Sequence, residues 1–330
     1  MSEAELEPDC EAGCPPPREI EQLIGHDEAI ASFDALHRAG RLHHAWMLTG
    51  PKGVGKASLA YLLAGHLLGE GAYSRIRAQS HPNLLVIRRP WDDKRKKWRG
   101  EITMDEIRRV PDFFSRKAGE IGWRIAIIDS LDELNINSAN GLLKTLEEPP
   151  DKGILFLVTH SPGRLLPTIR SRCRRLDLRV PPTDETRTWL TATHSVSAAD
   201  ADIAIAMADG APGRALALER SGALGLEKDI AGLIDRLPQW DEKASRRLAA
   251  KLSVKAGESL RPHFYASLIR RSAAQARSAV EEGRAPEPWL DAWRRLQGLS
   301  READAIYLDP KQAALAALSE IEQAGRAAAR

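Results

Sequence analysis

Residues 45–57 read Ala-Trp-Met-Leu-Thr-Gly-Pro-Lys-Gly-Val-Gly-Lys-Ala, an apolar run that leads into a glycine-rich turn. The frame Gly-x4-Gly-Lys matches a phosphate-binding loop (P-loop), in which backbone N–H groups surround phosphate oxygens and the lysine reaches the terminal phosphates. A helical pattern follows, and a helix N-terminus adds positive potential at that place. We therefore predict that Gly50, Gly53, Gly55 and Lys56 bind a nucleotide. A glycine-rich strand-to-helix turn without a ligand is the alternative.

The residue after Lys56 departs from this motif. A Ser or Thr normally stands there and binds Mg²⁺ through its hydroxyl, but this chain has Ala57. Ser58 is a poor replacement, because one step along a helix turns a side chain by about 100°. A magnesium ion would lose a protein ligand, so we expect Mg-ATP to bind weakly or not at all.

A second acidic position follows a later apolar run. Residues 124–129 read Arg-Ile-Ala-Ile-Ile-Asp, which predicts a buried strand that ends at Asp129. Asp129 fits the carboxylate that holds Mg²⁺ in P-loop proteins. In hydrolysing relatives of this layout a Glu follows and polarises the attacking water, but here Ser130 follows. We interpret Asp132 and Glu133 as solvent-facing or capping residues, so two parts of the hydrolytic machinery are missing together.

Strand and helix patterns alternate from about residue 20 to 180, which is typical of an α/β domain with a parallel sheet. The predicted strands are short and apolar and lie at 45–49, 84–88, 123–129, 154–159 and 175–180. Thr103 and Glu106 form a capping box that begins a helix, which Pro111 is expected to kink or shorten.

Composition divides the chain into four parts. Residues 1–18 end in Cys-Pro-Pro-Pro-Arg and are expected to form a mobile or extended lead-in. Residues 19–181 hold the α/β domain. After residue 181 the strand patterns stop and Ala, Leu, Arg and Glu dominate, so we predict a small helical domain at 182–222 and a larger one at 223–330.

Composition also limits the classes of function. The chain has 330 residues, 43% of them hydrophobic and 28% charged, as in soluble globular proteins, and its net charge of +2 predicts no partner. We expect a cytoplasmic protein, because the sequence has no apolar run of the roughly 20 residues that span a membrane and its acidic beginning does not resemble a signal peptide. The chain has three cysteines, Cys10, Cys14 and Cys173, which cannot form a disulfide scaffold. No second pair of metal-ligating residues follows Cys10 and Cys14 at zinc-site spacing, so no metal site is predicted.

Several further stretches together resemble one family. Residues 140–150 read Asn-Gly-Leu-Leu-Lys-Thr-Leu-Glu-Glu-Pro-Pro, residues 171–173 read Ser-Arg-Cys, and His43-His44-Ala45-Trp46 and His81-Pro82-Asn83 stand on either side of the P-loop. This combination resembles the bacterial clamp-loader subunits of the AAA+ superfamily, and within them the delta-prime branch of DNA polymerase III. The resemblance is dense from about residue 20 to 180. It implies an AAA+ P-loop domain, a helical lid domain at 182–222 and a helical collar domain for oligomerisation at 223–330.

The resemblance also implies roles for three residues outside the P-loop. Arg172, in the Ser-Arg-Cys motif, would act in trans as an arginine finger on the γ-phosphate of ATP bound by a neighbouring subunit. Thr159, with His160 as the competing choice, would be the polar sensor of the γ-phosphate, and Arg214 the second sensor in the lid. The simpler alternatives are an Arg172 paired with a carboxylate at a helix end, a Thr159 placed for packing and a solvated Arg214. The four-cysteine zinc module of the family has no counterpart at residues 69–80, so we predict no zinc.

The implied partners are the gamma/tau ATPase subunits and the delta subunit of the loader, with the sliding clamp and primed DNA contacted through the complex. A catalytically active motor subunit like gamma or tau stays an alternative, because Lys56 and Asp129 are retained. A small-molecule kinase is disfavoured, because no substrate loop or cluster of lid arginines accompanies the P-loop. Residues 88–99 hold seven basic residues with Trp91 and Trp98 between them. An exposed hairpin or loop is the simpler interpretation of this segment, and direct DNA binding is the other.

Overall fold

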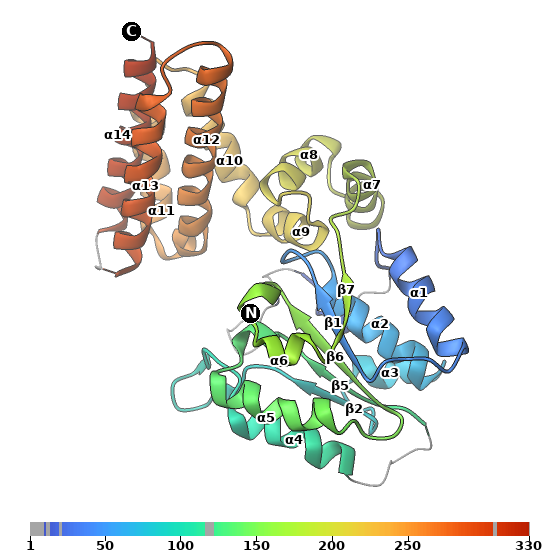
Figure 1. The fold of residues 1–330 in the computed structure, drawn as a ribbon. Coiled ribbons are helices and arrows are strands. Elements are labelled where there is room, and N and C mark those ends of the chain that lie inside the picture. Colours follow the sequence, from blue (N-terminus) through green and yellow to red (C-terminus); the bar gives the residue numbers. More distant parts are fainter. Residues whose placement is uncertain (1–9, 11–13, 20–21, 116–121, 306–308, 330) are drawn as a thin grey trace. The chain divides into compact units, whose positions relative to one another are not determined.

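The computed structural model describes residues 10, 14–19, 22–115, 122–305 and 309–329, and the chain divides into two compact units (Figure 1). The first unit ends at Ala217 and the second begins at Leu218, inside helix α9 (Pro212–Arg220). The sequence places this boundary at 222/223. The separate lid boundary at 181/182 stays a prediction.

The first unit is built on a sheet of five parallel strands. Their order is β2 (Leu84–Ile87), β5 (Arg124–Ile128), β6 (Gly153–Thr159), β1 (Ala45–Thr49) and β7 (Arg174–Asp177). Strand β6 therefore lies between β1, which leads into the P-loop, and β5, which leads to Asp129. Because parallel strands end at the same edge of a sheet, Gly50, Asp129 and the end of β6 at Thr159 come together there, where α/β folds bind ligands.

Strand β7 differs from its prediction. The sequence predicts an apolar strand over 175–180, but β7 reads Arg-Arg-Leu-Asp and ends at Asp177. An edge strand has a neighbour on one side only, so it does not need the apolar sequence of a central strand. The chain then leaves the sheet at Leu178, whose N–H donates to Thr49 O at 2.8 Å.

Helices cover both faces of this sheet. On one face Trp46, Leu48 and Phe156 pack against α1 (Asp27–Arg38), α2 (Lys56–Leu68) and α3 (Ala72–Arg77). On the other face Met47, Ile128 and Leu157 pack against α4 (Met104–Ser115), α5 (Ile136–Glu147) and the short α6 (Pro167–Arg170). Figure 1 shows these two layers. The alternation of side chains along each strand explains why the strands are apolar throughout, since each face has its own core.

Local signals fix where several helices begin. Helix α4 begins after Thr103, as the capping box predicts, and it continues four residues past Pro111 to Ser115. Asn135 caps α5 by accepting a hydrogen bond from Ser138 N at 2.9 Å. Turns of 3₁₀ helix lie at η2 (Pro17–Glu19), η3 (Leu131–Glu133) and η4 (Pro162–Arg164).

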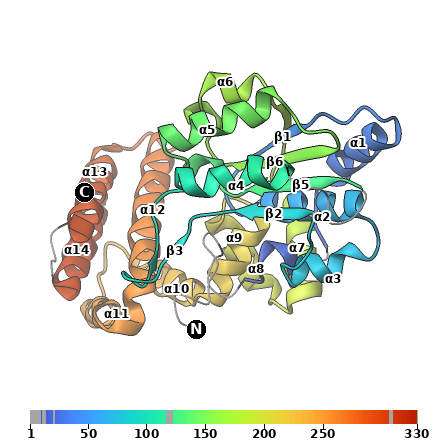
Figure 2. The same ribbon diagram turned by 90° about the horizontal axis from the view of Figure 1, so that it is seen from below.

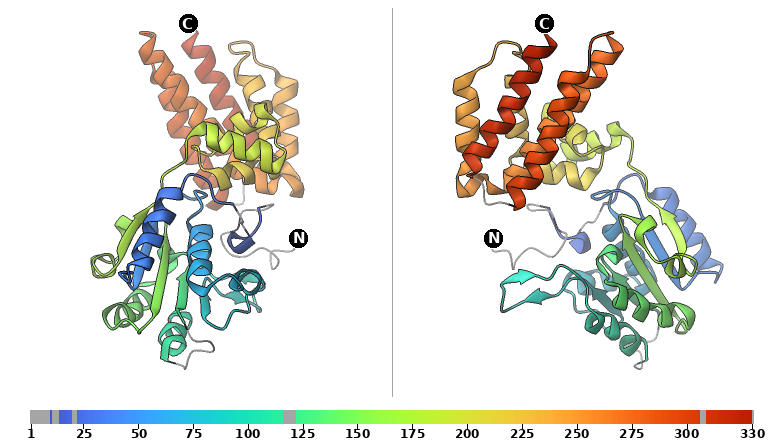
Figure 3. Two further views of the ribbon diagram at one scale, coloured as in Figure 1. Left: turned by 90° about the vertical axis from the view of Figure 1, so that its right-hand side faces the viewer. Right: turned by 60° about the vertical axis from the view of Figure 1, so that its left-hand side comes forward.

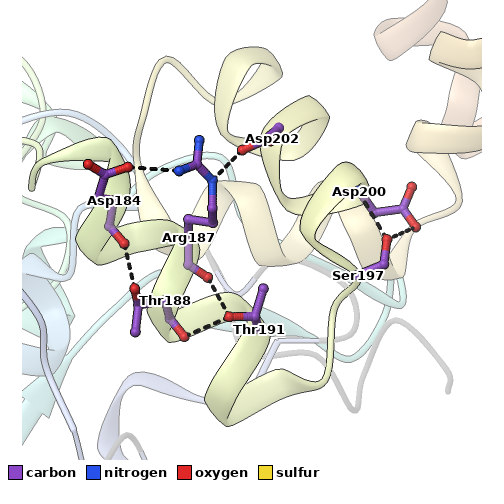
Figure 4. A network of polar contacts seen from close by, with 7 residues as sticks. All are labelled: Asp184, Arg187, Thr188, Thr191, Ser197, Asp200 and Asp202. Atoms are coloured by element: carbon purple, nitrogen blue, oxygen red, sulfur yellow. Dashed lines mark hydrogen bonds and ion pairs between the residues drawn. The ribbon is translucent and has the colours of Figure 1, made fainter.

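The end of the first unit is helical. It holds α7 (Thr183–His194), α8 (Ala198–Met207) and the first part of α9. Figure 4 shows the contact that joins α7 to α8, in which Arg187 donates to Asp202 at 2.5 Å. Arg187 also donates to Asp184 of its own helix at 2.7 Å. Ser197 caps α8 by accepting from Asp200 N at 3.1 Å.

The second unit is all helical over its described residues. It contains the end of α9, then α10 (Ala223–Ile234), α11 (Glu242–Ser253), η5 (Lys255–Leu260), α12 (Arg261–Glu281), α13 (Glu287–Ala305) and α14 (Pro310–Ala328). Its buried residues include Ile230, Leu268, Leu296 and Ile321. Glu227 is also buried and accepts from Ser267 at 2.6 Å and from Arg271 at 2.7 Å, which joins α10 to α12. Among the described residues of both units, no helix is long and apolar enough to cross a membrane.

Candidate functional site

The P-loop has the backbone shape that a phosphate site requires. Gly50 and Gly53 have φ of 144° and 80°, which residues with a side chain rarely adopt. A Cβ on Gly50 would lie 2.4 Å from Leu178 O, and a Cβ on Gly53 would lie 2.7 Å from Arg214 N. Both glycines are therefore required by the backbone around them, and Gly55 follows as the N-cap of α2.

The ammonium group of Lys56 binds carbonyl oxygens of its own loop. It donates to Gly50 O at 2.7 Å and to Pro51 O at 2.6 Å, and the residue is 3% exposed. Burial lowers the pKa of Lys56 to about 8. The nearby carboxylates of Asp129 and Asp132 act in the opposite direction and raise this pKa, but burial has the larger effect. The ammonium would have to leave both carbonyls to bind a phosphate.

Asp129 lies buried at the end of β5, as predicted, but it is already paired. Arg88 Nε lies 3.5 Å from Asp129 Oδ2, and Arg88 also donates to the Tyr61 hydroxyl at 3.0 Å. Burial raises the pKa of Tyr61, so it stays a neutral hydrogen-bonding group.

Asp132 is a capping residue, which was one of the two predicted interpretations. It accepts hydrogen bonds from Thr159 Oγ1 at 2.8 Å, His160 N at 2.6 Å, Ser161 N at 3.0 Å and Ser130 Oγ at 2.9 Å. Burial alone would raise the pKa of Asp132, but these hydrogen bonds hold it below its ordinary value. Thr159 is buried and gives its hydroxyl to this carboxylate, so its role as a sensor stays a prediction that requires the contact to break.

Three contacts around the P-loop are not predicted by the sequence pattern. His26, the N-cap of α1, is buried and donates from Nε2 to Val54 O at 2.8 Å. The described part of the lead-in lies at the same cavity, where Cys14 Sγ donates to Gly213 O at 3.6 Å. Gly213 N in turn donates to Gly53 O at 2.8 Å, so α9 begins directly against the P-loop. The remaining residues of the predicted lead-in lie outside the described residues.

The cavity bounded by these groups measures about 140 Å³. Lys56, Asp129, Gly213 and Cys10 line it, but Arg214 is not among its described lining residues. The Arg214 side chain is exposed and lies 3.6 Å from Asp209, so its role as the second sensor stays a prediction. A site for a small molecule normally measures roughly 300–1,000 Å³, so a nucleotide would need the lead-in or Lys56 to move.

The donor set fits the phosphates of ATP better than its magnesium ion. The loop offers backbone N–H groups and Lys56, but Ala57 has no hydroxyl and Asp129 is paired with Arg88. Within the described ranges no three His, Cys, Asp or Glu side chains gather as metal ligands.

Arg172 lies at the surface of the first unit, two residues after α6. Its Nη1 donates to Thr168 O at 2.8 Å, and its Nη2 lies 2.8 Å from Glu147 Oε1, at the last residue of α5. Its side chain is 35% exposed. This is the pairing with a carboxylate at a helix end that the sequence leaves open as the alternative.

Cys173, the third residue of the Ser-Arg-Cys motif, has a packing role. It is half-buried and packs against the sheet face that carries Met47 and Leu157. Burial raises the pKa of its thiol to about 12, so it serves as a small apolar anchor and not as a nucleophile. The anchor holds the neighbouring Arg172 at the surface.

Comparisons with known proteins show which families this chain is similar to. Residues 25–182 match the family model described as DNA polymerase III, delta subunit. The DNA polymerase III subunit delta' of Pseudomonas aeruginosa is 32% identical over 204 residues, which cover 58% of this chain and 60% of that protein. Residues 25–182, which include most of the α/β domain, are therefore similar to DNA polymerase III delta-prime subunits. The delta' subunit of Escherichia coli is also 32% identical, over 56% of this chain and 57% of its own length.

The chain is also similar to gamma subunits of DNA polymerase III. The DNA polymerase III subunit gamma of Buchnera aphidicola is 29% identical over 166 residues, which cover 50% of this chain and 46% of that protein. The matched segments of the delta' relatives span only about 60% of those proteins. A gamma subunit-related protein from Thermotoga maritima is similar in structure over 89% of this chain and 99% of its own, with 18% identity and a TM-score of 0.44. A likeness at this level supports no functional conclusion.

Proposed function

We propose that this chain is a delta-prime subunit of a DNA polymerase III clamp loader that gives Arg172 to the ATP site of a neighbouring subunit. The supporting observation is the placement of Arg172, which lies at the surface beside the half-buried Cys173. Among the described residues, its side chain is bound by the exposed Glu147 carboxylate and by Thr168 O. A guanidinium near a γ-phosphate stabilises the charge that develops as the phosphoryl group leaves.

Under the same proposal, the chain has no ATPase activity of its own. Ala57 and Ser130 lack the metal-binding hydroxyl and the water-activating carboxylate, and Lys56 bonds to its own loop. ATP with Mg²⁺ would supply a phosphoryl group for transfer if it bound. Here Lys56 and the loop amides would hold only its phosphates, so we propose that Mg-ATP binds weakly or not at all, and that no zinc is needed.

The proposed partners are the gamma/tau ATPase subunits and the delta subunit, with the sliding clamp and primed DNA reached through the assembled loader. They follow from the delta-prime family and from the gamma and tau relatives, the latter including the tau subunit of Bacillus subtilis, 28% identical over 174 residues. A bacterial loader that acts on chromosomal DNA works in the cytoplasm, so we propose this location.

The ATPase of the purified chain tests this proposal against an active gamma/tau-like motor. We expect turnover at background with and without DNA. We also expect that Ala57→Thr strengthens Mg-ATP binding in isothermal titration calorimetry without comparable turnover, because Ser130 still cannot activate water. Turnover of about one per second by the unmodified chain, a common rate for enzymes, would favour the motor and remove the proposal.

A further inference from the structure

A two-stranded hairpin follows strand β2 and is not used by the proposed function. Its strands are β3 (Trp91–Asp92) and β4 (Lys97–Trp98), and β3 is labelled in Figure 2. Trp91 pairs with Trp98 and Asp92 with Lys97. Figure 3 shows the hairpin extending from the first unit beyond the edge of the main sheet.

Side chains at the base and in the turn order this hairpin. The rings of Trp91 and Trp98 meet edge to face, with centroids 5.3 Å apart, and both residues are half-buried. The Asp92 carboxylate accepts hydrogen bonds from Lys94 N and Arg95 N, both at 3.1 Å, which fixes the turn. Cross-strand aromatic pairs stabilise a hairpin by roughly 0.2–1 kcal/mol. The tip therefore has a defined shape and is not a loose basic loop.

The structure separates the seven basic residues of segment 88–99 into two groups. Three are paired with acids at the base: Arg88 with Asp129 at 3.5 Å, Arg89 with Glu133 at 3.0 Å and Arg99 with Asp92 at 3.7 Å. The other four are consecutive and exposed, at Lys94, Arg95, Lys96 and Lys97. Among the described residues, no acid lies within ion-pairing distance of these four.

We propose that the hairpin tip, residues 93–97, binds the phosphate backbone of DNA directly. The tip holds four exposed cations and one acid, Asp93, on a turn whose backbone is fixed. Lysine and arginine bind phosphates without reading the bases, so this contact is independent of sequence. Trp91 and Trp98 pack against each other at the base, so the contact between the tip and DNA is electrostatic and does not use these rings. The inference deepens the proposed function, because it places DNA on this chain itself.

The experiment measures how salt weakens binding of the full chain, and of the assembled loader, to a fluorescein-labelled primer–template DNA. The hairpin variant is Lys94→Gln, Arg95→Gln, Lys96→Asn and Lys97→Gln, with Asn chosen because Lys96 has a φ of 52°. Each phosphate contact contributes about 0.9 to the slope of log affinity against log salt. We expect the variant to lose about 3 to 4 from this slope, so between about 50 and 200 mM salt the unmodified protein loses about a hundredfold more affinity than the variant.

A matched control removes four exposed cations from α11: Lys243→Gln, Arg246→Gln, Arg247→Gln and Lys251→Gln. Two of these already pair with acids, Arg246 with Glu242 and Lys251 with Asp229. We expect the control to keep the slope of the unmodified protein. An unchanged slope in the hairpin variant, or an equal loss in the control, overturns the inference. So does a hairpin variant that binds DNA normally but no longer assembles, since the tip would then bind a protein.

The test also distinguishes this inference from the finger proposal. At saturating DNA the hairpin variant should support the full ATPase of the reconstituted loader, and Arg172→Ala should keep the full salt slope. If the loader does not assemble around this chain at all, the proposed function fails, while the salt slope of the chain alone still decides whether the tip binds DNA.

Discussion

Arg172 is held in the isolated chain by contacts that a triphosphate can replace. Its carboxylate partner, Glu147, is itself half exposed, and exposed ion pairs contribute only about 0–1 kcal/mol. A γ-phosphate carries more charge and offers several acceptor oxygens in a desolvated site, so it binds a guanidinium more strongly than this carboxylate does. Under the proposed function, the ion pair and the finger are two states of one side chain.

Replacing Glu147 with Gln tests this competition. The ion pair is lost, but the midpoint of thermal unfolding should change little, because the pair is at the surface. The ATPase of the reconstituted loader should stay the same or rise by up to about fivefold, the equivalent of roughly 1 kcal/mol. If the ATPase instead falls as far as with Arg172→Ala, Glu147 positions the finger and does not compete for it.

Lys56 gives the chain a pH-dependent stability. Its folded pKa of about 8 lies below the ordinary 10.5, so from about pH 8 to 10.5 the unfolded chain binds more protons and this group makes the fold more stable as the pH rises. Below pH 8 the buried charge costs roughly 3 kcal/mol. We expect Lys56→Met to gain stability over the unmodified chain by about that amount near pH 7, and to lose most of the gain near pH 10. Urea unfolding measures both; a difference that does not vary with pH contradicts the burial of a charged Lys56.

At the scale of elements, the contact between the P-loop and α9 joins the predicted nucleotide site to the predicted lid. Gly53 and Gly213 touch through their backbones, with Gly213 N donating to Gly53 O at 2.8 Å. A displacement of the P-loop must therefore displace the start of α9, which is a path by which a phosphate could move the lid.

Gly53→Ala tests this contact, with Gly40→Ala as its control. Both glycines have positive φ, 80° and 64°, but a Cβ at Gly40 meets no atom within 4 Å, whereas at Gly53 it meets Arg214 N at 2.7 Å. Gly40→Ala should therefore cost only the backbone strain, about 1–2 kcal/mol. Gly53→Ala should cost at least twice as much in urea unfolding, since backbone cannot move aside easily. Equal losses would mean that α9 does not pack on the loop.

The elements that sequence predicts well are those fixed by local chemistry. Central strands covered on both faces must be apolar, and the glycine frame and capping residues set the beginnings of α2 and α4. Other features depend on residues far apart in the chain, which periodicity does not connect. They are the edge strand β7, the hydrogen-bond partners of Asp132, the role of His26 and the lead-in at the cavity. The division of the cations in segment 88–99 into paired and unpaired ones likewise depends on Asp129 and Glu133, which follow the segment by 30 and 34 residues.

For the whole molecule, the proposed subunit has an incomplete nucleotide site of its own and carries its proposed finger, Arg172, at the surface of the first unit. The sequence predicts Arg172 through its motif, but the surface position, the Glu147 contact and the Cys173 anchor come from the structure. An arginine that acts on another subunit has no substrate within its own chain, so its role is measurable only in the assembly.

The most direct measurement is therefore the ATP turnover of a loader reconstituted with this chain, unmodified or carrying Arg172→Ala, with Arg172→Lys as a variant that keeps the charge but loses the planar fork. Size-exclusion chromatography verifies that each loader assembles. We predict full assembly and a loss of at least one ATP site's share of the turnover in both variants, since a finger contributes about 10³ or more at its site. Full turnover by an intact loader that carries Arg172→Ala would contradict the account.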